Sequence, residues 1–273
     1  MNLFKWFKKK PQPEFRLGLA LGSGGAKGFA ELGALYALEQ NGIEFDIVAG
    51  TSIGSIIGAF YAAGYSSTDI SELLKSVDVS EIKNFFMIKM DTLGLMKVID
   101  RTIGDLDIEE LKKPFKAVAT ELDTGKEYVF DKGNVATALA ASSSYPPFFK
   151  PVSVGGVKLI DGAFTNSVPA DLVRGMGADY VVGIDLSSHV KSGGGILSAI
   201  FPEFDGGVEE PWQKGYENSD VMLHPDLSEY KAVSFAAGNK LYEIGYECAM
   251  KRISEIKAGI AAVKAKKGIK VKK

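Results

Sequence analysis

Residues 19–64 read LALGSGGAKGFAELGALYALEQNGIEFDIVAGTSIGSIIGAFYAAG, and this stretch decides the fold. It holds most of two short apolar runs, residues 15–21 and 46–50, which end at glycine, as buried parallel strands often do. Each run leads into a segment with apolar residues at helical spacing, residues 27–40 and 53–64. The sequence therefore predicts two consecutive units of strand, glycine turn and helix.

The rest of the chain continues this alternation. Strands are expected at residues 116–122, 127–130, 157–160 and 180–186, and helices near 134–144, 170–176 and 232–256. Such alternation predicts an α/β fold, a three-layer α/β/α sandwich around a largely parallel central sheet. A chain of 273 residues is long enough for one large core. We therefore expect a single domain at 14–256 between basic tails at 1–13 and 257–273.

The charge distribution argues against nucleic acid as a ligand. The chain holds 32 Lys and Arg and 34 Asp and Glu. Residues 1–10 contain four of the Lys, and residues 251–273 contain nine basic residues and one Glu, so the body between them is strongly acidic. Nucleic acid needs a basic working face, which this body lacks.

The N-terminal segment MNLFKWFKKK, residues 1–10, interleaves aromatic residues with lysines. Such a segment suits peripheral contact with an anionic membrane surface, and a solvated tail is the alternative. It lacks the apolar stretch and cleavage site of a secretory signal, and no run of about 18 apolar residues follows, which predicts a cytoplasmic location. The single cysteine, Cys248, is expected to be a buried structural thiol.

The pentapeptide Gly50-Thr51-Ser52-Ile53-Gly54 has the form G-x-S-x-G and stands between a predicted strand and a predicted helix. In that context the serine occupies a sharp turn that exposes its hydroxyl above the sheet edge. The two glycines leave room for strand and helix to approach closely. Ser52 is therefore the candidate nucleophile, and a glycine turn that merely packs is the alternative.

A serine hydroxyl needs a base within hydrogen-bond reach. The two histidines, His189 and His224, lie in no recognisable catalytic motif. Asp161 ends the predicted strand VKLI and precedes a glycine turn, so we expect it at the same end of a parallel sheet as Ser52. Asp161 is the candidate base, unless it only caps the turn through backbone N–H groups.

The segment Gly22-Ser23-Gly24-Gly25-Ala26-Lys27-Gly28 connects the first strand to its helix. Successive small residues at a helix N-terminus bring backbone N–H groups together around an anion. A dinucleotide site would need an acidic residue at the end of the second strand, where this chain has Ser52. The loop therefore fits an oxyanion hole better than a phosphate site.

Taken together, residues 19–64, the segment ASSSYPPFFKPV at 141–152, the Asp161-Gly162-Ala163 motif and the PDL…GY pattern at 225–246 resemble patatin-like phospholipases. The resemblance implies a patatin-like fold, a catalytic dyad of Ser52 and Asp161 without histidine, and acyl transfer from lipid to Ser52 followed by hydrolysis. It implies oxyanion donors at the N–H groups of Gly24, Gly25, Ala26 and Ile53. The remaining motif positions are Gly22, Lys27, Gly28, Gly50, Gly54, Gly162 and Ala163.

Three positions depart from the pattern of that family. Ser23 stands where relatives often have Gly, Lys27 where they often have Arg, and Glu31 where many have His. Lys27 keeps the positive charge but lacks the planar two-pronged donor set of arginine. The consequence of Glu31 does not follow from the sequence.

The function expected from these features is hydrolysis of ester bonds in phospholipids, lysophospholipids or related acyl lipids, without cofactor or metal. A regulatory protein of the same fold that binds lipid or protein with little turnover is the alternative, and a nucleotide-binding protein is a third. Residues 80–104 are expected either to cover an apolar substrate or to form a pair of packed core helices. Residues 192–207 are expected to form either a mobile loop or lid, or a disordered surface segment. No feature specifies an oligomeric state.

Overall fold

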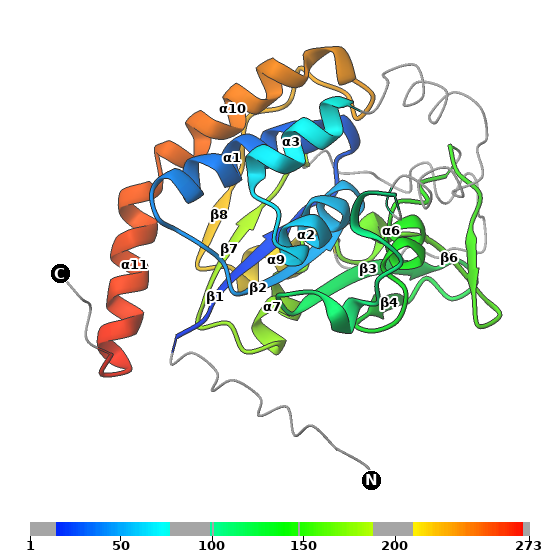
Figure 1. Ribbon diagram of the computed structural model, residues 1–273, viewed down its shortest axis with the longest axis horizontal. Coiled ribbons are helices and arrows are strands. Elements are labelled where there is room, and N and C mark those ends of the chain that lie inside the picture. The colour runs from blue at the N-terminus through cyan, green and yellow to red at the C-terminus, as the bar shows by residue number, and fades with distance from the viewer. Residues whose placement is uncertain (1–14, 77–98, 100, 147, 188–209, 270–273) are drawn as a thin grey trace, which may run out of the picture.

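The computed structural model describes residues 15–76, 99, 101–146, 148–187 and 210–269, and it contains a central sheet with helices on both faces (Figure 1). The strands are β1 (Leu17–Leu21), β2 (Ile47–Thr51), β3 (Phe115–Glu121), β4 (Glu127–Phe130), β5 (Val152–Val154), β6 (Val157–Asp161), β7 (Tyr180–Ile184) and β8 (Val221–Leu223). The longer helices are α1 (Gly28–Gln40), α2 (Ile53–Ala63), α3 (Ser67–Ser76), α6 (Val135–Ser142), α10 (Gly238–Met250) and α11 (Ile253–Lys266). Shorter helical segments are η1 (Gly25–Lys27), η2 (Ile108–Glu110), η3 (Gly162–Phe164), α7 (Ala170–Gly175), α9 (Gln213–Asn218) and η4 (Phe235–Ala237).

The sheet is parallel at its centre and antiparallel at one side. The strand order is β5-β6-β3-β2-β1-β7-β8, with β4 also paired to β3. The strands from β3 to β8 in this order are mutually parallel, whereas β4, β5 and β6 add antiparallel pairs. A tight turn at Gly155 and Gly156, both with positive φ, joins β5 to β6 as a hairpin. The expected α/β sandwich is confirmed, with a mixed sheet.

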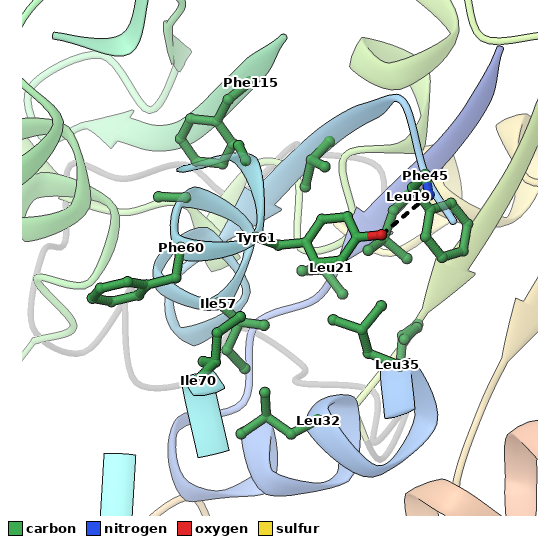
Figure 2. Packing of buried hydrophobic residues seen from close by; sticks show 14 of the residues in the cluster. Leu19, Leu21, Leu32, Leu35, Phe45, Ile57, Phe60, Tyr61, Ile70 and Phe115 are labelled. Atoms are coloured by element: carbon green, nitrogen blue, oxygen red, sulfur yellow. Dashed lines mark hydrogen bonds between the residues drawn. The ribbon is translucent and has the colours of Figure 1, made fainter. Parts of the chain in front are cut away.

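Alternation along the strands assigns each helix to a face of the sheet. Leu19 and Leu21 of β1 belong to the larger core, which is covered by α1, α2 and α10, whereas Ala20 belongs to a smaller core under α7. In Figure 2 the buried side chains of α1 and α2, including Leu32 and Ile57, meet those of β1. Ser52 follows the last residue of β2, and Asp161 is the last residue of β6.

Tyr61 of α2 connects this helix to the turn before β2 within the larger core. Its hydroxyl oxygen accepts the Phe45 N–H at 3.2 Å, and the two rings meet edge to face (Figure 2). Burial raises the pKa of this phenol to about 12, because the charged form would be poorly solvated there. The turn that leads into β2 is therefore anchored to α2, which follows Ser52.

The carboxyl ends of β2 and β6 meet end to end. β4 overlaps both the part of β3 that pairs with β2 and the part that pairs with β6. A strand has only two edges, so β2 and β6 share the edge of β3 opposite β4. Thr51 pairs with Val118 and Asp161 pairs with the next residue, Ala119, which brings Asp161 level with Ser52.

This arrangement corrects the reason given for Asp161. The prediction placed Asp161 at the end of a strand parallel to β2, but β6 is antiparallel to β3 and therefore also runs against β2. The position is reached because β3 is longer than β2 and extends past its carboxyl end. β6 pairs with that extension and runs back toward the edge.

Most predicted elements occur within one or two residues of their expected bounds, but the C-terminal region differs. The single helix expected near 232–256 is broken between α10 and α11. Residues 257–266, expected in a basic tail, continue α11 instead. That helix buries Ile256, and Lys267 just after it donates to Asp179 Oδ1 at 2.5 Å. The short strands β5 and β8 had no prediction.

Several predicted features lie outside the described residues. These are the N-terminal segment 1–10, His189, the apolar segment 192–207 and most of 80–104. In the parts of the chain that the structure describes, no helix combines the length and the apolar character needed to cross a membrane.

Candidate active site

Ser52 occupies a strained turn between β2 and α2. Its φ of 57° and ψ of −125° make it the only non-glycine residue with positive φ among those described. The turn requires glycine on both sides, because a Cβ on Gly50 would lie 2.2 Å from the Gly54 carbonyl oxygen and a Cβ on Gly54 would lie 2.5 Å from that of Leu21. Such strain is tolerated where the surroundings fix the backbone, and here it presents the hydroxyl.

Ser52 and Asp161 are hydrogen bonded to each other. The Ser52 hydroxyl donates to Asp161 Oδ2 at 2.6 Å, and the other carboxylate oxygen, Oδ1, accepts the Ala163 N–H at 2.9 Å. The Asp161 side chain is 1% exposed. Thus the carboxylate both caps the turn after β6 and reaches the serine, so the two alternatives considered from the sequence are combined.

Burial makes the Asp161 carboxyl a weaker acid than an exposed aspartate. Desolvation raises the pKa of its carboxyl to about 7, against the opposing effect of the hydrogen bonds from Ser52 and Ala163. A carboxylate with a pKa near neutrality is a much better proton acceptor than an exposed one. The pair therefore has the geometry and the basicity for Ser52 to lose its proton to Asp161.

Ser142, at the end of α6, is a contact that sequence reasoning missed. Its hydroxyl oxygen accepts the Ser52 N–H at 2.9 Å, and the residue is fully buried. Ser52 follows the last residue of β2, and Ser142 supplies the acceptor that its N–H needs. Ser142 lies in the segment 141–152 that matched the family, which was the available signal, but no role was attached to it.

Replacing Ser142 with alanine is expected to lower kcat for a soluble ester about tenfold, with little change in KM. The buried Ser52 N–H would lose its acceptor, at a cost of about 1–3 kcal/mol, and the turn would hold the nucleophile less firmly. The measurement is steady-state hydrolysis by folded protein. Ser144→Ala is the matched control, because the Ser144 hydroxyl donates to the Ala140 carbonyl and, among the described residues, makes no bond to Ser52. Equal losses in both variants would contradict this role.

The glycine-rich loop is anchored at both ends beside the elbow. The Ser23 N–H donates to the Ser167 carbonyl at 3.0 Å, and the Lys27 ammonium donates to the Leu186 carbonyl at 3.4 Å. Gly28 lies directly against Ile53, since a Cβ there would be 2.3 Å from its side chain. The loop and the start of α2 are therefore in contact.

One expected oxyanion donor is not directed to the site. The Ala26 N–H donates to the Ala232 carbonyl at 2.7 Å, which occupies it in this conformation. Gly25 lies against the same carbonyl, since a Cβ there would be 2.5 Å from its oxygen, and the positive φ of 57° at Gly25 turns the loop. The Gly24 and Gly25 N–H groups remain as proposed donors, together with that of Ile53, which opens α2 and so has no acceptor in a preceding helical turn.

Lys27 carries the only positive charge of the loop. It is 7% exposed, and burial lowers the pKa of its ammonium, an effect that the nearby Asp185 carboxylate opposes. The ammonium thus lies between the loop and the end of β7. Lys27 can therefore hold the loop through its single charged ammonium group, although it lacks the forked donor set of an arginine.

The described histidine stands apart from the dyad. His224 Nδ1 is 2.7 Å from the Tyr216 hydroxyl and 3.8 Å from Asp185 Oδ2, at the end of β8. Cys248 is partly buried on α10, and desolvation raises the pKa of its thiol. Among the residues with described positions, no cluster of His, Cys, Asp or Glu side chains is arranged to hold a metal ion.

A cavity of about 720 Å³ lies elsewhere, at the opposite end of α2 from Ser52. Its lining includes Gly64, Tyr65, Leu73, Ile103 and Lys112. Because α2 spans 11 residues at about 1.5 Å each, this cavity is about 16 Å from Ser52. It is therefore separate from the dyad.

Fold and site together define an α/β protein with a serine–aspartate pair at a nucleophile elbow. The family model described as patatin-like phospholipase matches residues 19–174. Patatin-like phospholipase domain-containing protein 6 of Homo sapiens is 34% identical over 276 aligned residues, which cover 85% of this chain and 20% of that protein. The chain belongs to the patatin-like phospholipase family.

One further relative agrees with that assignment, and one solved structure shares the fold. An uncharacterised NTE family protein of Mycobacterium tuberculosis is 33% identical over 178 residues, covering 63% of this chain and 49% of the relative. The chain thus spans about half the length of that relative. The structure of VipD from Legionella pneumophila has the same fold, with a TM-score of 0.57 at 14% identity over 89% of this chain and 67% of VipD.

Proposed function

We propose that the protein is a serine acyl hydrolase that cleaves ester bonds of phospholipids, lysophospholipids or related acyl lipids. The observation that carries the proposal is the hydrogen bond of 2.6 Å from the Ser52 hydroxyl to Asp161, a buried carboxylate whose pKa is raised to about 7. Membership of the patatin-like phospholipase family supports a lipid substrate.

The reaction follows from the placement of these groups. Asp161 takes the Ser52 proton as Oγ forms a bond to the ester carbonyl carbon, and the carbonyl oxygen becomes an oxyanion held by the Gly24, Gly25 and Ile53 N–H groups. The carbon–oxygen bond to the alcohol then breaks, and the alcohol leaves with the proton from Asp161. Water then loses a proton to Asp161 as its oxygen bonds to the acyl carbon. The bond from that carbon to Oγ breaks, Asp161 returns the proton to Oγ, and the fatty acid leaves.

Aromatic side chains beside Asp161 suit an apolar acyl group. The Tyr145 and Phe164 rings stack with their centroids 5.0 Å apart, and the centroid of the Phe148 ring lies 6.5 Å from that of Tyr145. Burial and the Asp161 charge together raise the pKa of Tyr145, which places this ring close to the base. Phe148 is 37% exposed, so the group extends from the dyad to the surface.

Labelling with a fluorophosphonate, followed by peptide mass spectrometry, tests the proposal directly. We expect one adduct, on Ser52, and hydrolysis of p-nitrophenyl esters together with at least one member of a phospholipid and lysophospholipid panel. Absence of both label and turnover would favour a binding protein of the same fold. Label without turnover of any lipid would retain the nucleophile but exclude the lipid substrate.

For residues 1–10 we propose peripheral contact with an anionic membrane, on the basis of sequence alone. Deleting them is expected to weaken sedimentation with phosphatidylserine vesicles, because each Lys near such a surface contributes about 1 kcal/mol. The loss should be largest at low salt, and turnover of a soluble ester should not change. Equal sedimentation of the full-length and shortened proteins would refute the contact.

A further inference from the structure

Glu31 is a fully buried acidic residue that the proposed reaction does not use. It lies in the first turn of α1 and has no exposed surface. Its Oε1 accepts the Gly22 N–H at 2.6 Å, whereas Oε2 has no hydrogen-bond partner among the described residues. Burying a carboxyl group with an unpaired oxygen costs folding free energy, so we expect this side chain to contribute to the structure or the activity.

Gly22 is the residue at which β1 leaves the sheet. The parallel ladders on both sides of β1 end at Leu21, which is paired with Gly50 and with Ile184. The next N–H, that of Gly22, has no strand partner, and a buried N–H needs an acceptor. Glu31 supplies it from the helix that follows the glycine-rich loop, so the loop is closed at its first residue.

The same glycine also touches the elbow helix. A Cβ on Gly54 would lie 2.6 Å from the Gly22 carbonyl oxygen, so the backbones of the two residues are in direct contact. The proposed oxyanion donors come from both sides of this contact, from Gly24 and Gly25 in the loop and from Ile53 in α2. Fixing Gly22 therefore fixes the two sets of donors relative to each other.

The pKa of Glu31 is compatible with a structural role as a hydrogen-bond acceptor. Burial raises the pKa of its carboxyl well above the usual value, and the Asp185 carboxylate adds to this, while the Gly22 N–H acts in the opposite direction. Burial therefore favours the uncharged form of this side chain. Glutamine reproduces its shape and its acceptor oxygen, and methionine reproduces only its length.

We propose that Glu31 is a positioning residue that holds the oxyanion loop against α2 by accepting the Gly22 N–H. The proposal rests on the proposed acyl hydrolase function, since it assigns Glu31 to the geometry of that site. Glu31 touches neither Ser52 nor Asp161 in any described contact, and it acts through the backbone of the loop.

The test compares Glu31→Met, Glu31→Gln and a matched control, Glu39→Met. Glu39 lies on the same helix and also accepts a backbone N–H, that of Ser67 at 3.2 Å, but far from the loop. We expect Glu31→Met to speed hydrogen exchange in a peptide covering residues 22–28 and to lower kcat about tenfold, with KM changed less than about threefold. Glu31→Gln should restore both within about threefold, and Glu39→Met should alter neither.

Two results would overturn the proposal. One is a Glu31→Met protein whose loop exchange and kcat match those of Glu39→Met, and the other is a Glu31→Gln protein as impaired as Glu31→Met. If Glu31→Met does not fold, Glu31→Asp makes the same comparison, because its carboxyl is one methylene too short to reach Gly22. A wild type without label or turnover would refute the acyl hydrolase itself, and loop exchange would still decide whether Glu31 anchors the loop.

Discussion

Replacing Ser52 with alanine is expected to abolish ester hydrolysis and fluorophosphonate labelling together. In the proposed reaction the hydroxyl oxygen forms the acyl bond, and its removal leaves Asp161 with no proton to accept, so the rate should fall at least about 1,000-fold. The substitution adds no bulk to the tight turn, and the fold should be retained. The measurements are single-turnover hydrolysis of a soluble ester, adduct mass and the circular dichroism spectrum.

Ser55→Ala is the matched control for this substitution. The Ser55 hydroxyl donates to the Ser52 carbonyl at 2.6 Å, so it lies in the same turn but is separate from the reacting oxygen. It should retain labelling and most turnover. Turnover above a few per cent in Ser52→Ala would show that another residue is the nucleophile.

Asp161→Asn is expected to lower kcat at least about 100-fold, because the amide keeps the shape of the carboxylate but cannot take the Ser52 proton. The proposed reaction needs ionised Asp161, so kcat/KM of the wild type should rise with pH through about 7, the pKa to which burial raises this carboxyl. A rate independent of pH between 5 and 9 would show that another group is the base.

His224→Gln tests the alternative base among the described residues. His224 contacts Tyr216 and Asp185, and neither contact involves the dyad. This variant should keep substantial turnover with an unchanged pH profile. A loss equal to that of Asp161→Asn would require a triad that includes this histidine.

The same carboxyl should also affect stability, with a definite sign. Its pKa is higher in the folded protein than in the unfolded chain, so the folded state binds the proton more tightly. The free energy of unfolding therefore decreases as pH rises from about 4 to about 7, and Asp161→Asn lacks this decrease. The variant should gain in Tm relative to wild type between pH 5 and pH 8. Asp69→Asn, at an exposed carboxyl whose pKa Ser66 lowers, should show no such gain.

Local sequence patterns were sufficient for the central parallel sheet. Apolar runs ended by glycine specified β1 and β2 nearly residue by residue, because strands buried on both faces leave little freedom in composition. The antiparallel hairpin β5–β6 was only half predicted. Its first strand has three residues, none of them buried, and short edge strands carry little apolar signal.

Three features of the site were beyond the reach of the sequence. The contact of Ser142 with Ser52 joins residues 90 positions apart. The Ala232 carbonyl that occupies the Ala26 N–H lies in a turn before η4, where the sequence predicted the start of a helix. The sequence marked Glu31 as a departure from the family pattern but did not indicate its consequence. In each case the partner is a backbone group, and backbone groups leave no trace in residue type.

The sequence by itself determined that Ser52 stands in an elbow between strand and helix, since glycines at 50 and 54 and the flanking patterns are local properties. It also singled out Asp161 from its place after a strand. Only the tertiary structure decided that the two meet, because the hydrogen bond depends on β3 extending past β2 and on β6 running back along that extension. The burial that raises the pKa of Asp161 likewise comes from packing of distant segments, which residue order alone does not specify.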